Sequence, residues 1–448
     1  MTLSTAARAV QGTLRGADTE FTGVSTDTRR LTRGDLFVAL TGPRFDGNAF
    51  VAQAAQSGAV GALVSRAIEA PIPTVVVDDT RLALGRLAAD WRSRFNIPLV
   101  AVTGSNGKTT VKNMIAAILA ERGATLATAG NLNNDIGVPL TLLRLRARDR
   151  FAVIEMGMNH SGEIDTLTHL ASPTVALVNN AAAAHLAGLG SVEAVAHAKG
   201  EIFSGLAADG TAVINADDPY AGLWRNLAGT RRLLSFGLDQ AADIHATYTL
   251  EDRGSLIHLH TPHGETTMRL PLLGRHNVMN ALAASGAALA AGASLADIQA
   301  GLEKLKAVSG RLEIKRGVHG ARVLDDSYNA NPDSLAAGIE VLRNAGGVRV
   351  LVFGDMGELG ESAGALHRRI GALAHQVGIE HLYALGELSR EAVSAFGSGA
   401  QHFETHEAMT EALRHNLRAG MTVLVKGSRA MKMERIVAGI VEEPAGAN

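Results

Sequence analysis

A short glycine-containing loop lies where a predicted strand meets a predicted helix. The apolar run Leu99–Val102 is followed by the sequence GSNGKTT at positions 104–110. Glycines let the backbone curl so that N–H groups point at phosphate oxygens, and the start of a helix adds a favourable dipole. Lys108 would reach the β- and γ-phosphates, and the Thr109 hydroxyl would bind Mg²⁺. The loop residues expected at a nucleotide are Gly104, Asn106, Gly107, Lys108, Thr109 and Thr110.

The glycine spacing differs from that of the standard phosphate loop. The standard loop has a glycine five residues before its second glycine, and Val102 occupies that position here. A glycine turn that binds no ligand is therefore the alternative. The Gly-Lys-Thr-Thr run at the junction of strand and helix favours phosphate binding.

A lysine falls on the apolar face of a predicted helix over residues 191–206. Ser191 can cap this helix, and Lys199 shares a stripe with Val195 and Ile202. Burial favours the uncharged amine, which can add CO₂ to become a carbamate, an oxygen ligand suited to Mg²⁺. The alternative is that Lys199 extends along the helix edge into water.

Two more candidate metal ligands follow predicted strands. Glu155 comes directly after the strand at 151–154, and His185 follows the strand at 174–178 by a short loop. Active sites of open α/β sheets form at the carboxyl ends of strands, where the phosphate loop also opens. A lone histidine in a loop is usually incidental. The evidence for a metal site is therefore that Glu155 and His185 are both expected at the same edge of the sheet as the phosphate loop. We expect Thr109, Glu155, His185 and a carbamylated Lys199 to hold two Mg²⁺ ions.

The composition limits what the protein can be. A length of 448 residues predicts two to four domains, and a hydrophobic fraction of 46% supplies several cores. The net charge of −2 gives no general attraction for nucleic acid or for an anionic membrane. There are no cysteines, which excludes disulfides and thiolate metal sites. No signal-peptide pattern and no membrane-spanning apolar run is found, so we expect a cytoplasmic protein.

The predicted elements indicate three α/β domains. Residues 1–82 form a small N-terminal domain, with strands at 35–40 and 74–77 and a helix at 50–58, and a helix at 82–95 leads into the next domain. Residues 83–307 form a doubly wound, mostly parallel sheet with strands at 99–102, 151–154, 174–178 and 211–214 and an antiparallel hairpin appendage at 244–270. Residues 308–448 form a Rossmann-like domain, with strands at 322–324, 348–353, 381–385 and 422–425.

Taken in chain order, these segments resemble the Mur ligase family. DTR at 27–29, GDLFVAL at 34–40 and DG at 46–47 resemble the family's UDP-binding domain. The loop at 104–110, with its shortened glycine spacing, matches the family phosphate loop, and AKGEI at 198–202 matches the segment of its carbamylated lysine. GNLNNDIGVP at 130–139, DDSYNANP at 325–332, GDMGELG at 354–360 and His367 resemble the member that adds D-alanyl-D-alanine.

The resemblance implies roles for individual residues. Asn280, in GRHNVMNA at 274–281, would contact adenine, Arg311 would reach the ATP phosphates from the third domain, and Asp326 would lie at the ribose. Lys108, His185 and Lys199 would be the catalytic set. A carboxylate could dock after the strand at 422–425, although a solvated loop explains that segment equally well. The residues expected to contact substrates are Thr28, Arg29, Asp46, Asn133, Asn134, Asn329, Asn331, Lys426, Ser428 and Arg429.

The implied activity is ATP-dependent formation of an amide bond. UDP-N-acetylmuramoyl-tripeptide would be activated as an acyl phosphate and joined to D-alanyl-D-alanine by a monomeric enzyme, with release of ADP and phosphate. One alternative is addition of a single diamino acid to the UDP-dipeptide, but the Asp-Asn-Pro-Arg motif of that ligase is missing. The alternative from another class is a non-enzymatic nucleotide switch, which the inward lysine and the substrate-like N-terminal domain disfavour.

Overall fold

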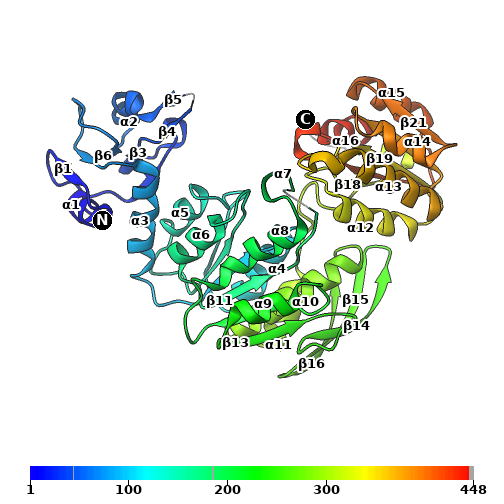
Figure 1. The fold of residues 1–448 in the computed structure, drawn as a ribbon, viewed down its shortest axis with the longest axis horizontal. Helices are drawn as coiled ribbons and strands as arrows, with labels where there is room; N and C mark the ends of the chain where they lie inside the picture. The colour runs from blue at the N-terminus through cyan, green and yellow to red at the C-terminus, as the bar shows by residue number, and fades with distance from the viewer. Residues whose placement is uncertain (44, 184–185, 443–448) are drawn as a thin grey trace.

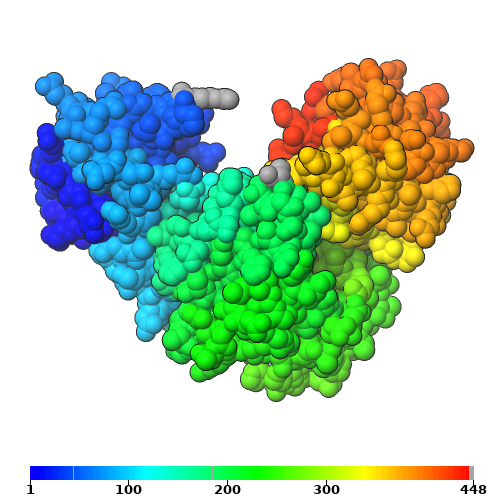
Figure 2. Space-filling view, viewed as in Figure 1, coloured from blue at the N-terminus to red at the C-terminus, as the bar shows by residue number. Residues whose placement is uncertain are grey.

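The computed structural model describes residues 1–43, 45–183 and 186–442. Three α/β units follow one another along the chain, and the first and third stand as two arms on the central unit (Figure 1). An open space separates the two arms above the central unit (Figure 2). The three-domain α/β architecture predicted from the sequence is thus confirmed.

The N-terminal unit is built on a five-stranded sheet of order β1-β7-β6-β3-β2. Only β1 runs antiparallel to its neighbour, and the other pairs are parallel. The predicted strands and helix correspond to β3, β7 and α2, each shorter than expected. The elements are α1 (Leu3–Val10), β1 (Thr13–Arg15), β2 (Gly23–Ser25), η1 (Thr28–Arg30), β3 (Asp35–Val38), β4 (Thr41–Gly42), β5 (Phe45–Asp46), η2 (Gly47–Phe50), α2 (Val51–Gln56), β6 (Gly61–Val64) and β7 (Thr74–Val76).

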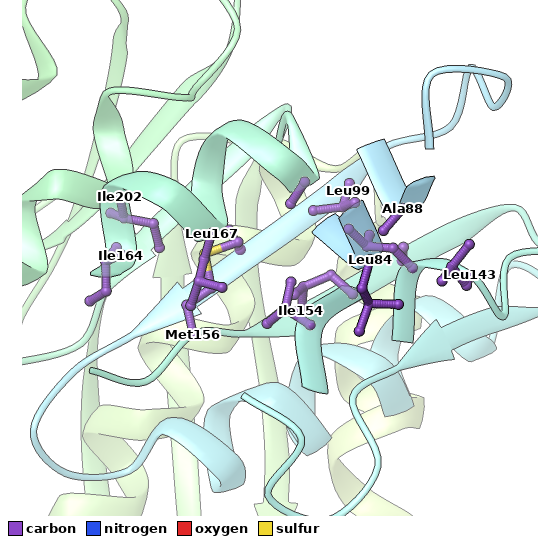
Figure 3. Packing of buried hydrophobic residues seen from close by; sticks show 14 of the residues in the cluster. Leu84, Ala88, Leu99, Leu143, Ile154, Met156, Ile164, Leu167 and Ile202 are labelled. Carbon is purple, nitrogen blue, oxygen red and sulfur yellow. The ribbon is translucent and has the colours of Figure 1, made fainter. Parts of the chain in front are cut away.

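Helix α3 (Thr80–Arg92) connects the first unit to the second. It begins at Asp79, whose carboxylate accepts the N–H groups of residues 81 and 82. Leu84 and Ala88 on its buried face belong to one apolar cluster with Leu99 and Ile154 of the central sheet (Figure 3). The helix therefore crosses the division expected after residue 82 and packs the first unit against the second.

The central sheet has six parallel strands in the order β13-β12-β11-β8-β10-β9. Its strands are apolar and mostly buried because helices cover both faces, which gives two separate apolar clusters. The strands are β8 (Leu99–Thr103), β9 (Thr125–Ala127), β10 (Phe151–Glu155), β11 (Val175–Val178), β12 (Thr211–Asn215) and β13 (Arg232–Phe236). The helices are α4 (Lys108–Ala120), α5 (Gly137–Leu142), α6 (Glu163–Ala171), α7 (Leu186–Leu189), α8 (Val192–Gly200), η3 (Glu201–Phe203), α9 (Ala221–Ala228), α10 (Arg275–Ala290) and α11 (Leu295–Glu303).

The appendage has one strand more than the expected hairpin. Strands β14 (His245–Glu251), β15 (Gly254–Thr261) and β16 (Gly264–Leu270) form a three-stranded antiparallel sheet. Ile257, Leu259, Met268 and Leu270 of this sheet are buried in the same cluster as α10 and α11. The apolar side of the appendage thus covers part of the central unit.

The C-terminal unit is a mixed six-stranded sheet of order β17-β18-β22-β19-β20-β21, in which only β17 is antiparallel. The four predicted strands are β18, β19, β20 and β22, and the edge strands β17 and β21 were not predicted. The strands are β17 (Glu313–Arg316), β18 (Arg322–Asp326), β19 (Val348–Gly354), β20 (His381–Leu385), β21 (Ala400–Phe403) and β22 (Met421–Lys426). The helices are η4 (Val318–Gly320), α12 (Pro332–Arg343), η5 (Gly360–Ser362), α13 (Ala363–Gln376), α14 (Arg390–Phe396), α15 (His406–Asn416), η6 (Arg429–Met431) and α16 (Glu434–Ile440).

No helix within the described part of the chain is both long enough and apolar enough to cross a membrane.

Candidate active site

A cleft of about 860 Å³ opens at the carboxyl ends of the central strands, between the central and C-terminal units. The phosphate loop follows β8, Glu155 is the last residue of β10, and Asn179 and Asn180 follow β11. Most residues proposed from the sequence meet in this cleft. Those lining it are Asn106, Gly107, Lys108, Thr109, Thr110, Asn133, Asn134, Glu155, Asn280, Arg311, Asp326, Asn329, Asn331, Lys426, Ser428 and Arg429.

The loop after β8 has the geometry expected of a phosphate-binding turn. Gly107 has a φ of 78°, and α4 begins at the next residue, Lys108. A side chain at position 107 would lie 2.5 Å from Oδ1 of Asn280 and 2.6 Å from Nδ2 of Asn179, so only glycine fits. The Lys108 amine donates to the carbonyl oxygens of Gly104 at 2.6 Å and Ser105 at 3.2 Å. Burial lowers the pKa of Lys108, and the Glu155 carboxylate opposes that shift.

Lys199 points into the protein, as the helical periodicity predicted. Its side chain is 1% exposed, and Ser191 caps α8 by accepting the N–H of Ala194. Burial, with a further contribution from the Lys108 cation, brings the pKa of Lys199 well below its ordinary value. The predicted helix over 191–206 was too long, because the chain tightens into the 3₁₀ turn η3 after Gly200. The buried, uncharged amine is the form that can add CO₂.

Glu155 offers oxygen atoms to a cation. The side chain is 2% exposed, and Oε1 accepts from Nδ2 of Asn133 at 2.9 Å. Oε2 is buried and has no hydrogen-bond partner among the described residues. A buried carboxylate oxygen without a partner is costly, and a hard cation such as Mg²⁺ would satisfy it. The residues present therefore fit Mg²⁺. The fourth candidate ligand, His185, lies outside the described residues.

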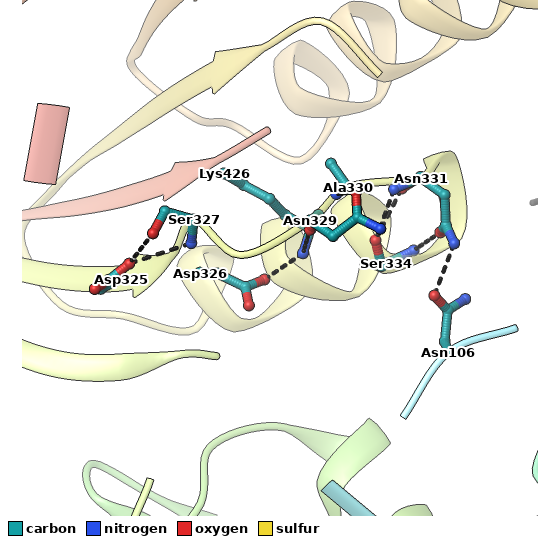
Figure 4. A network of polar contacts seen from close by, with 9 residues as sticks. All are labelled: Asn106, Asp325, Asp326, Ser327, Asn329, Ala330, Asn331, Ser334 and Lys426. Atoms are coloured by element: carbon teal, nitrogen blue, oxygen red, sulfur yellow. Dashed lines mark hydrogen bonds and ion pairs between the residues drawn. The ribbon is translucent and has the colours of Figure 1, made fainter. Parts of the chain in front are cut away.

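The third unit reaches the phosphate loop through two side chains. Arg311 donates to the Thr109 hydroxyl at 3.0 Å, and its guanidinium lies over the Tyr328 ring at 4.4 Å. Nδ2 of Asn331 donates to Oδ1 of Asn106 at 2.8 Å (Figure 4). Arg311 is thus held at the phosphate loop by a hydrogen bond to Thr109 of the central unit and a ring contact with Tyr328 of the C-terminal unit.

Lys426 and Asp326 form a buried ion pair at the carboxyl ends of β22 and β18. The Lys426 amine lies 2.6 Å from Oδ2 of Asp326 and donates to the Asn329 carbonyl at 3.0 Å (Figure 4). Burial raises the pKa of Asp326, and Lys426 opposes that shift. The charge of Lys426 is therefore already balanced by Asp326. Ser428 and Arg429 line the cleft together with Lys426, and a substrate carboxylate would contact these two residues.

The candidate residues of the N-terminal arm lie away from the cleft. Thr28, Arg29 and Asp46 are not among its lining residues. Arg29 pairs with Asp27 at 2.8 Å. Asp46 accepts from Asn48 and Arg66, which lowers its pKa to about 2. A substrate that contacts both these residues and the phosphate loop must therefore extend from the N-terminal unit to the central unit.

Several polar residues at or near the site were not predicted from the sequence. Lys112, one helical turn after Lys108, is buried and donates to the Thr128 carbonyl at 2.8 Å. Its spacing of four residues was the available signal, since both side chains then lie on one face of α4. Asn179 directly follows the strand predicted at 174–178, and Tyr328 lies within the DDSYNANP segment, but neither residue was singled out because its contacts join segments distant in sequence.

His276, at the start of α10, makes the stability of the folded protein depend on pH. Burial, with a smaller contribution from the Lys426 cation, lowers the pKa of His276 from 6.5 to about 4. In the unfolded chain the imidazole takes up its proton first as the pH falls, so the folded state loses stability between about pH 6.5 and pH 4. We expect a loss of roughly 2 kcal/mol on going from pH 7 to pH 5.

Differential scanning calorimetry at the two pH values checks this expectation. His276→Asn keeps a polar, hydrogen-bonding side chain that does not titrate, so the transition temperature of this variant is expected to fall less between pH 7 and pH 5. The same fall in both proteins would contradict the assignment.

Comparisons with known proteins place this geometry in a family. The chain matches the Mur ligase family, catalytic domain, over residues 20–92, the Mur ligase middle domain over residues 102–288, and the Mur ligase, glutamate ligase domain over residues 310–429. The chain belongs to the Mur ligase family.

Several similar proteins carry the name of one ligase. The chain is 47% identical to UDP-N-acetylmuramoyl-tripeptide--D-alanyl-D-alanine ligase of Escherichia coli (strain K12), over 99% of this chain and 98% of that one. It is similar to a crystal structure of MurF from Acinetobacter baumannii, with a TM-score of 0.93, 38% identity and 98% of each chain covered. It is also similar to MurF ligase from Thermotoga maritima in complex with ADP, with a TM-score of 0.82 and 26% identity, over 93% of this chain and 96% of that one.

Proposed function

We propose that this protein is an ATP-dependent ligase that joins D-alanyl-D-alanine to UDP-N-acetylmuramoyl-tripeptide, as the names of its relatives state for them. One observation carries the proposal. A phosphate loop with its Lys108, an arginine from a second domain and the buried carboxylate of Glu155 meet in one cleft. We propose the domain roles expected from the sequence, with residues 1–82 binding the UDP group, residues 83–307 binding ATP, and residues 308–448 forming the C-terminal Rossmann-like ligase domain.

The cleft supports transfer of a phosphoryl group. The peptide carboxylate attacks the γ-phosphorus of ATP, ADP leaves, and an acyl phosphate forms. The dipeptide amine then attacks the acyl carbon, and phosphate and a proton are released as the amide bond forms. Such transfer depends mainly on positioning and on neutralising charge. Lys108 and Arg311 supply positive charge from opposite sides of the cleft.

The remaining site residues hold and orient the groups that react. Asn280 and Asp326 would contact the adenosine, and Ser428 and Arg429 the dipeptide carboxylate. Glu155, Thr109 and a carbamylated Lys199, with His185, would hold Mg²⁺. Bound Mg²⁺ would neutralise the charge that develops on the phosphate oxygens.

Phosphate release tests the proposed function. Purified enzyme with ATP and Mg²⁺ is expected to liberate phosphate only when the UDP-tripeptide and D-alanyl-D-alanine are both present, with one amide product formed for each phosphate. Substituting the UDP-dipeptide and free diamino acids for the two substrates tests the neighbouring activity. Equal phosphate release without the peptide substrates would instead indicate a nucleotide switch or a simple ATPase.

A further inference from the structure

Three buried amide side chains connect the two ends of the proposed ATP site. Nδ2 of Asn179 donates to the carbonyl of Asn106 in the phosphate loop and to Oδ1 of Asn280, both at 3.0 Å. Nδ2 of Asn280 donates to Oδ1 of Asn277 at 3.1 Å, and Asn277 donates to the Leu273 carbonyl at 2.8 Å. Asn179 is 1% exposed and does not line the cleft, so it acts only through its neighbours.

Main-chain carbonyls at both ends fix the direction of every bond in this chain. A carbonyl oxygen can only accept, so Asn277 must turn its NH₂ group to Leu273, and Asn179 must turn its NH₂ group to Asn106. The direction is enforced at a cost, because Oδ1 of Asn179 is buried with no partner among the described residues. Asn280 between them has one permitted orientation.

That orientation determines what Asn280 presents to the cleft it lines. An amide has two donor hydrogens and two acceptor lone pairs, and the chain uses one of each. One N–H and one lone pair remain. The edge of adenine offers the complementary N7 acceptor and N6 donor, whereas guanine offers two acceptors, N7 and O6.

We infer that Asn179 is a positioning residue that sets the choice of ATP over GTP by orienting Asn280. The inference deepens the proposed function and rests on it, because ATP must be the nucleotide used and Asn280 must contact its adenine. Asn179 also ties Asn280 to the phosphate loop, so one amide fixes the purine contact relative to the phosphates.

The neighbouring asparagine provides a matched control. Oδ1 of Asn180 accepts the N–H of Asn106 at 2.8 Å, and Nδ2 of Asn180 donates to the Asn106 carbonyl at 3.2 Å. Asn180 therefore holds the phosphate loop, and none of its described side-chain bonds reaches Asn280. Its loss should weaken ATP and GTP alike.

The experiment measures kcat/KM for ligation with ATP and with GTP. The ratio of the two values is independent of the fraction of enzyme that is folded, so a destabilised variant still reports selectivity. We expect Asn179→Ala to lower the ATP-to-GTP ratio about tenfold. Asn179→Asp is expected to lower the ATP-to-GTP ratio further. Its carboxylate repels the carbonyl oxygen of Asn106 and forces the side-chain amide of Asn280 to turn over, so that its NH₂ group faces position 179. Asn180→Ala is expected to raise KM for both nucleotides and leave the ratio unchanged.

Asn280→Ala and the double variant with Asn179→Ala complete the cycle. If Asn179 acts through Asn280, the double variant has the ratio of Asn280→Ala alone. The inference is overturned if Asn179→Ala keeps the ratio of the unsubstituted enzyme, if the two losses add, or if the unsubstituted enzyme uses ATP and GTP equally. An unsubstituted enzyme that ligates with neither nucleotide contradicts the proposed function instead.

Discussion

Lys199→Ala is expected to reduce ligation by about a thousandfold or more while the protein remains folded. The side chain is 1% exposed, and burial together with the Lys108 cation lowers the pKa of its amine well below the ordinary value. As a carbamate it would supply an oxygen ligand to Mg²⁺, and alanine supplies none. Initial rates at saturating ATP and Mg²⁺ measure the loss, and intact-protein mass measures the CO₂ adduct of the unsubstituted enzyme.

Two further variants separate this role from packing. Lys199→Met retains the length of the apolar stem, so it is expected to be as inactive as alanine with an unchanged thermal transition. Lys304→Ala removes an exposed lysine paired with Glu121 and is expected to leave the rate unchanged. Ligation by Lys199→Met at the unsubstituted rate would remove the carbamate from the mechanism.

The second large effect is expected at Arg311. Its guanidinium reaches the Thr109 hydroxyl at 3.0 Å, beside the loop that would hold the triphosphate. An arginine at the transferring phosphoryl group contributes about a thousandfold or more to kcat, and Arg311→Ala should lose that factor. Lysine keeps the charge without the planar fork, so Arg311→Lys should recover part of the rate.

Single-turnover measurements distinguish chemistry from binding at this position. The loss is expected in the rate of the chemical step, with a smaller change in ATP affinity. Arg343→Ala, at an exposed position of α12 paired with Glu340, is the matched control. A chemical step within about twofold of the unsubstituted rate in Arg311→Ala would show that Arg311 does not stabilise the transition state.

The geometric predictions at the site that the structure bears out are those whose signal is local. The phosphate loop combines a strand, two glycines and a helix start within a dozen residues, and the inward Lys199 follows from helical spacing alone. The contact of Arg311 with Thr109 joins residues 202 positions apart, so it was available only from the family resemblance. Asn179 directly follows the strand predicted at 174–178, where site residues are expected, but its bonds to Asn106 and Asn280 join distant segments and had no signal in the sequence.

The errors in the fold have similar physical causes. The helix predicted over 191–206 changes its winding at Glu201, whose carboxylate accepts from Ser161 and Gly162 on another segment. The edge strands β17 and β21 are short and only partly buried, so they lack the apolar runs that identified the central strands.

The apolar side of α3 has a consequence for how the chain matures during synthesis. Leu84 and Ala88 are buried against residues such as Ile154, Ile164 and Leu167, which lie far downstream. While the ribosome is still synthesising the central unit, the apolar surface of α3 is exposed to solvent. The nascent N-terminal unit can therefore reach its final stability only after about a hundred further residues have emerged. Until then, chaperones would bind the exposed apolar side of α3.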